Sequence, residues 1–160
     1  MIKNVWIDAD SCPPQVRNHV VKYCAGRSID VYFVANKAVD CKCGIEPAPF
    51  KMIVTDSSKD AADNYIFEHT TAGTQTNPST DLVITRDIVF ADRLVTKGVH
   101  VINDRGTEFT KEIIKERLGE RDLNLQLAQL GLAKSYNEGY DQKKFEKFAN
   151  CLDRVIVRNL

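Results

Sequence analysis

Five short apolar runs, separated by longer polar or mixed segments, are the main pattern along the chain. The runs are rich in β-branched and aromatic residues, which pack well in the interior of a sheet. They cover residues 2–7, 29–34, 50–54, 82–85 and 99–102. Polar or turn-forming residues follow each run. We therefore predict five buried strands.

Apolar residues at helical spacing fill much of the chain between these runs and most of its last third. Pro13 and Pro14 stand where a helix can begin, because the first turn does not need their missing N–H groups, and Gly26 closes that segment. The other predicted helices cover about residues 60–70, 88–97, 110–118, 122–132 and 141–157. We expect a loop over residues 35–49 and a flexible connector over residues 71–80.

Strands that alternate with helices favour right-handed crossovers and parallel strand pairing. We therefore predict an α/β fold with a mostly parallel five-stranded sheet, helices on both of its faces and an all-helical C-terminal segment. No repeat or domain boundary interrupts the pattern, so residues 1–160 are expected to form a single domain. In such sheets the functional site lies outside the carboxyl ends of the strands.

Composition adds limits on function. The chain has 160 residues, with 22 basic and 22 acidic side chains, and its zero net charge argues against strong, delocalised binding to nucleic acid but leaves room for a local basic rim. No apolar run approaches the roughly 18 residues that span a bilayer, and the first residues do not resemble a signal peptide. We expect a soluble, cytoplasmic protein with no membrane partner. Cys41 and Cys43 match no common zinc spacing, so we expect reduced surface thiols.

Aspartates follow or flank the predicted strands at the edge where a site is expected. Asp8 and Asp10 follow the first strand, Asp87 follows the fourth, and Asp60 and Asp63 begin the helix after the third. Carboxylates that converge repel one another and stay ionised together when a cation lies among them. Hard oxygen ligands suit Mg²⁺ or Mn²⁺, so the sequence predicts a divalent metal site.

Each acidic residue also has a simpler explanation. Asp10 could cap the turn before Pro13, and Asp60 and, less strongly, Asp63 could complement the dipole at the start of their helix. Asp81 and Asp92 are expected to be solvated surface charges.

Polar residues near these aspartates are candidate substrate contacts. They are Lys59, Asp60, Thr85, Asn103 and Arg105, of which Arg105 could bind a phosphate. Turn formation or surface solvation explains the same positions without any function.

The segments that carry these residues resemble the YaiI/YqxD family of uncharacterised bacterial proteins. The resemblance rests on residues 6–13, 60–63, 81–88, 103–106 and 148–154 and runs in order over about residues 2–157. The family is similar to PIN-like nucleases, whose sites are acidic clusters at the edge of a parallel sheet. The resemblance implies a PIN-like domain in which Asp8, Asp63 and Asp87 are catalytic metal ligands. Asp60 would lie beside Asp63.

The resemblance also places Asp10 and Asn103 in the same cleft, with Asp10 a further metal ligand. The connector over residues 71–80 is longer than is usual in the family, which could alter access to the cleft.

Three functions compete at this point. The first is a metal-dependent phosphodiesterase that acts on RNA or single-stranded nucleic acid. The second is a phosphatase of the haloacid dehalogenase type, in which Asp8 is the nucleophile and Asp10 the acid/base, although the immediate start of a helix leaves no room for that superfamily's flap. The third is a non-catalytic module that uses the acidic cleft to bind a metal or a protein partner.

Overall fold

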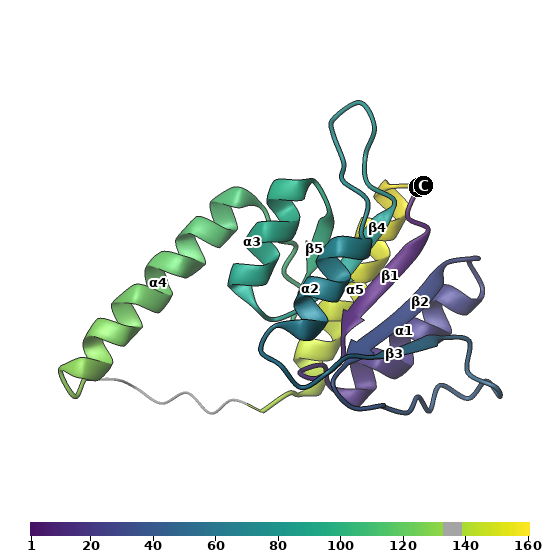
Figure 1. Cartoon of the computed structure of the whole chain (residues 1–160), viewed down its shortest axis with the longest axis horizontal. Helices are drawn as coiled ribbons and strands as arrows, with labels where there is room; N and C mark the ends of the chain where they lie inside the picture. Colours follow the sequence, from purple (N-terminus) through teal and green to yellow (C-terminus); the bar gives the residue numbers. More distant parts are fainter. Residues whose placement is uncertain (133–138) are drawn as a thin grey trace.

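A computed structural model describes residues 1–132 and 139–160 and contains one five-stranded sheet (Figure 1). The strands are β1 (Asn4–Asp8), β2 (Asp30–Ala35), β3 (Lys51–Val54), β4 (Asp81–Ile84) and β5 (His100–Ile102). Their order across the sheet is β3-β2-β1-β4-β5, and all four pairings are parallel. The prediction of an α/β fold with five strands is confirmed.

Helices cover both faces of this sheet, as predicted. They are α1 (Pro14–Ala25), α2 (Ala61–His69), α3 (Ile88–Lys97), α4 (Lys111–Gln129) and α5 (Gln142–Arg158). Apolar residues of α1 and α5 pack against one face of the sheet, and those of α2, α3 and the start of α4 pack against the other.

Successive side chains of β1 point to opposite faces of the sheet. Val5 and Ile7 belong to the core under α1 and α5, whereas Trp6 belongs to the core under α2 and α3. Side chains two apart in a strand share a face, so Asp8 points to the same side as Trp6. This places the carboxylate of Asp8 on the side of the sheet that α2 covers.

Strand order also fixes where a crevice forms. The chain runs outward from β1 to β2 and β3, then returns through α2 to the other side of β1 to form β4 and β5. The direction of winding therefore reverses between β1 and β4, and ligand sites of open α/β sheets form at such a point, beyond the carboxyl ends of the strands.

At the amino edge of the sheet, the expectation that Asp81 is a solvated surface charge is wrong. Asp81 is only 1% exposed and is not a surface residue. Its Oδ1 accepts hydrogen bonds from Asn4 Nδ2 and Trp6 Nε1, both at 3.0 Å, and its Oδ2 accepts from the backbone N–H of Thr71 at 2.7 Å. Asp81 thus joins β1, β4 and the connector. Asp92 is exposed, as expected.

The connector over residues 71–80 lies at this amino edge, since the backbone N–H groups of Lys3 and Asn4 donate to the carbonyl of Thr80. It therefore does not border the cleft at the opposite edge. Gly73 approaches Gly98 so closely that a Cβ on Gly98, whose φ is +88°, would lie 2.1 Å from the carbonyl oxygen of Gly73. Close packing holds this part of the connector in place.

The described part of the C-terminal segment is mostly helical, but the predicted break at residues 119–121 is wrong. The helix α4 continues through Gly119, and the glycine with a left-handed conformation is Gly131, whose φ is 72°. The outer half of α4 extends away from the sheet (Figure 1), where Leu123 and Leu125 are each 56% exposed. Apolar residues on more than one side of α4 obscured the single stripe that marks a packed helix.

All five cysteines are free thiols. Cys43 is buried, which corrects the expectation that both Cys41 and Cys43 are surface residues. Among the described residues, no helix combines the length and the apolar character needed to cross a bilayer.

Candidate functional site

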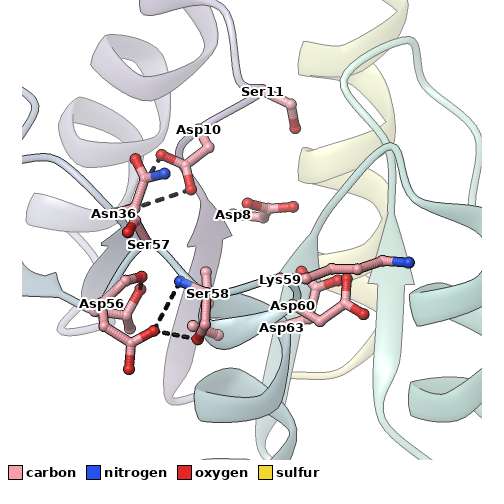
Figure 2. A pocket seen from close by; sticks show the side chains of 13 residues that line it. Asp8, Asp10, Ser11, Asn36, Asp56, Ser57, Ser58, Lys59, Asp60 and Asp63 are labelled. Carbon is pink, nitrogen blue, oxygen red and sulfur yellow. Dashed lines mark hydrogen bonds between the residues drawn. The ribbon is translucent and has the colours of Figure 1, made fainter.

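An open cavity of about 330 Å³ lies at the carboxyl edge of the sheet, where the loops after β1, β2 and β3 meet the start of α2. Its polar lining residues are Asp8, Asp10, Ser11, Asn36, Thr55, Asp56, Ser57, Ser58, Lys59, Asp60 and Asp63. Figure 2 shows Asp8 between Asp10 on one side and Asp60 and Asp63 on the other. Four of the aspartates selected from the sequence therefore border one cavity.

Asp8 is the last residue of β1 and is buried. The hydroxyl of Thr85, which follows β4, donates to Asp8 Oδ2 at 3.3 Å. Burial, followed by repulsion from Asp10 and Asp87, raises the pKa of Asp8 to about 6, against the lowering effect of the Thr85 hydrogen bond. Loss of water is thus the main cost of ionising this carboxylate.

Asp63 lies in the first turn of α2 and is also buried. Burial and then the charges of Asp8, Asp87 and Asp60 raise its pKa to about 7, while Arg93 lowers it. A carboxylate that merely complemented a helix dipole would be stabilised in its ionised form. The environment of Asp63 instead favours the protonated form of its carboxyl group.

Asp87 lies on the side of β4 and does not line the cavity, although it is near enough to act on Asp8 and Asp63 through its charge. It is exposed and forms the N-cap of α3, where its Oδ1 accepts from the backbone N–H groups of Val89 at 2.9 Å and Phe90 at 3.1 Å. Its charge raises the pKa of both Asp8 and Asp63. Asp87 therefore has a structural role and also adds charge to the acidic group.

Asp10 and Asp60 lie at the rim and are exposed. Both carboxylate oxygens of Asp10 accept from the backbone N–H of Asn36, each at 3.2 Å, so Asp10 ties the loop after β1 to the end of β2 and does not cap α1. Asp60 is at the N-cap of α2 with a left-handed φ of 62° and makes no side-chain capping bond there. Lys59 is exposed at the same rim.

The turn after β5 holds the remaining two candidates, and neither lines the cavity. Asn103 is buried, and its Oδ1 accepts from the backbone N–H groups of Arg105 at 3.0 Å and Thr107 at 2.9 Å. These hydrogen bonds stabilise the turn itself. Arg105 is exposed.

Sequence analysis did not select Asn36 or Asp56 as lining residues. Asp56 Oδ1 accepts from the backbone N–H of Ser58 at 2.9 Å and from its hydroxyl, and these bonds lower the pKa of Asp56. Asn36 follows β2 directly, and Asp56 is two residues past β3. Their positions beyond strand ends were the signal that could have identified them.

The donor set can be compared with what a divalent ion needs. Within residues 1–132 and 139–160, no three or more His, Cys, Asp or Glu side chains are grouped closely enough to form a ready-made ligand shell. Mg²⁺ commonly uses one or two protein carboxylates and completes its octahedron with water and substrate oxygens. Asp8 and Asp63 are buried, repel each other and face open space, so they fit an ion held in that way.

Comparison with known proteins gives one family. Residues 6–158 match the family model described as "Uncharacterized BCR, YaiI/YqxD family". The chain belongs to this family. Among its relatives is a UPF0178 protein of Treponema denticola, 38% identical over 156 residues that cover 98% of this chain and 93% of the relative. Another UPF0178 protein, from Ectopseudomonas mendocina, is 40% identical and covers 96% of this chain and 97% of the relative.

The resemblance stated from the sequence is thereby confirmed for the family. No solved structure gives a significant match to the chain.

Proposed function

We propose that the chain is a divalent-metal-dependent phosphodiesterase that cleaves RNA or single-stranded nucleic acid. The observation that carries this proposal is the convergence of Asp8 from β1 and Asp63 from α2, both buried, on one open cavity. The charge of Asp87 raises the pKa of both residues. Buried carboxylates with raised pKa values in a cavity are typical of functional sites.

In this proposal Asp8, Asp63 and Asp87 hold Mg²⁺ or Mn²⁺, with Asp10 as a further ligand at the rim. The ion would supply charge neutralisation and activation of water for attack on a phosphodiester. The chain's own contribution is orientation. Thr85 fixes Asp8 through its hydroxyl, and the backbone of α3 fixes Asp87 through two N–H groups. Fixed carboxylates need little reorganisation when charge develops during reaction.

We propose a single strand as the substrate. The cavity, with a volume of about 330 Å³, has room for a phosphate group and a neighbouring sugar. Lys59 at the rim could contact a flanking phosphate. The zero net charge of the chain is consistent with recognition of a short stretch of strand rather than extended wrapping.

The test is cleavage of single-stranded RNA and DNA by purified protein with Mn²⁺. We expect cleavage by the wild-type protein and by Asp92→Asn, which changes an exposed aspartate of α3. We expect none by Asp8→Asn. Absence of cleavage by the wild-type protein, or equal cleavage by Asp8→Asn, would contradict the proposal.

The same preparations separate the two other candidate functions. A phosphatase with Asp8 as nucleophile would bind beryllofluoride as an aspartyl-phosphate mimic, yet the chain enters α1 at Pro14, which leaves no room for that superfamily's flap. A binding module would take up metal without turnover of any phosphoester, which calorimetry would detect.

A further inference from the structure

A second, narrower hollow adjoins the cavity and shares Asp8 and Ser11 with it. It is a narrow crevice with no room for a water molecule, so a ligand can contact only its mouth; its other lining residues are Cys12, Ile84, Thr85, Arg86 and Asp104. Among the described residues that line the two hollows, the basic side chains are Lys59 and Arg86. Arg86 is therefore the basic residue that lines this crevice together with Asp8.

The guanidinium of Arg86 is fixed from one side. Asp104, which is 2% exposed, accepts from Arg86 Nε at 2.6 Å and lies 2.5 Å from Arg86 Nη2, both through its Oδ2. The Arg86 side chain is nevertheless 41% exposed. Within the part of the chain that the structure describes, Arg86 Nη1 has no hydrogen-bond partner, and the buried Oδ1 of Asp104 has none either.

An arginine that served only to neutralise Asp104 would gain most by pairing with both carboxylate oxygens in the usual fork. Here both contacts go to one oxygen, so the outer edge of the guanidinium remains available. A planar guanidinium with free donors and a fixed orientation suits the oxygens of a phosphate. Its sequence neighbours are Thr85, whose hydroxyl donates to Asp8, and Asp87, whose backbone N–H donates to Thr85.

We propose that Arg86, held in place by Asp104, is the anion-binding residue of this site and binds a phosphate group beside Asp8. The inference deepens the function proposed above and rests on it for the identity of the anion as a phosphodiester. The binding itself does not depend on catalysis. Several aspartates repel a polyanion, and Arg86 supplies a fixed positive group at the crevice that Asp8 also lines.

The probe is inorganic phosphate, titrated by calorimetry into the full chain with and without Mg²⁺. We expect Arg86→Gln to weaken phosphate binding about tenfold or more, since a charge-assisted hydrogen bond contributes on that scale. Arg86→Lys keeps the charge but loses the fork, and we expect a smaller loss. Arg154→Gln, at an exposed position on α5 that lines neither hollow, is the matched control and should bind phosphate as the wild-type protein does.

Arg86→Gln leaves Asp104 buried without its partner and could fail to fold. The double variant Arg86→Gln/Asp104→Asn removes both charges, and we expect it to fold but to bind phosphate no better than the single variant. Unchanged phosphate affinity in either variant would overturn the inference. Loss of binding in Arg105→Gln but not in the Arg86 variants would place the anion at the turn after β5 instead.

The two proposals can fail separately. Asp8→Asn should lose cleavage, but in the absence of Mg²⁺ it should keep its phosphate affinity or increase it, because repulsion falls while Arg86 is unchanged. If wild-type protein cleaves nothing but binds phosphate through Arg86, the proposed function fails and this inference stands. If the wild-type protein cleaves nucleic acid, and Arg86→Gln changes neither phosphate affinity nor the substrate concentration for half-maximal rate, the proposed function stands and this inference fails.

Discussion

The hydroxyl of Thr85 donates to the carboxylate of Asp8 at 3.3 Å and accepts from the backbone N–H of Asp87 at 3.1 Å. One side chain thus connects the end of β1 with the start of α3 and controls two members of the acidic group. The bond to Asp8 opposes the rise in pKa that burial causes. Thr85 is therefore expected to keep part of the Asp8 population ionised.

Thr85→Val preserves the shape of the side chain and removes the hydroxyl. We expect the pKa of Asp8 to rise above about 6 and cleavage at neutral pH to fall about tenfold. Carboxyl ¹³C NMR would follow the titration of Asp8. Thr85→Ser, which keeps the hydroxyl, is the control, and identical titrations for the two variants would contradict the role given to this hydrogen bond.

Asp63→Asn should change the pH dependence of stability. The pKa of Asp63 in the folded chain, about 7, lies above its ordinary value of 3.8, so the folded state holds a proton that the unfolded state has lost. The unfolding free energy contributed by this group therefore decreases as pH rises from about 4 to about 7. We expect Asp63→Asn to be more stable than wild type by about 2 kcal/mol at pH 8.

Urea unfolding of metal-free protein at pH 5 and pH 8 would measure this difference, which should shrink at the lower pH. Asp92→Asn, at an exposed position, is the control and should differ little from wild type at either pH. A stability gain for Asp63→Asn that did not grow with pH would rule out repulsion and burial as its cause.

Addition of Mn²⁺ should raise the thermal midpoint of the protein, and more at pH 8 than at pH 5.5. Metal ligands must be deprotonated, and Asp8 and Asp63 lose their protons only near pH 6 and pH 7. Calorimetry in two buffers of different ionisation enthalpy should detect proton release on binding at pH 6. We expect Asp8→Asn to lose most of the stabilisation, and a pH-independent effect would speak against binding at these carboxylates.

Asp81→Ala should destabilise the chain by about 3 kcal/mol, because it leaves the amide of Asn4, the indole of Trp6 and a backbone N–H without their acceptor. Trp6 is the only tryptophan, so its fluorescence should report the change directly. Asp92→Ala provides the comparison at an exposed aspartate. Because Asp81 lies at the amino edge of the sheet, the folded fraction of the variant should keep its affinity for Mn²⁺.

Local patterns were sufficient to predict the five strands and the covering of both faces. The β-branched runs and the helical periodicity of segments such as α5 are set by neighbours in sequence. The grouping of Asp8 with Asp63 could also be predicted, because in a parallel sheet every strand end of one kind lies at the same edge. That argument needs only the topology.

Features that depend on distant partners could not be predicted in the same way. Asp81 is buried because the indole of Trp6 and the amide of Thr71 require an acceptor, and its position at the start of a strand reveals neither. Gly119 resembles a helix stop in sequence, but its neighbours continue the hydrogen-bonding pattern of α4. The pairing of Arg86 with Asp104 joins two turns that only the β4–β5 pairing brings together.

The central place of β1 has a consequence for synthesis. One edge of β1 finds its partner as soon as β2 is made, but the other has none until residues 81–84 have been translated. During that interval a nascent chain presents a row of unpaired amides and carbonyls along an apolar strand, which is the kind of surface that self-associates. Fragments that stop before β4 should therefore precipitate, and recovery of native protein after dilution from denaturant should fall as its concentration rises.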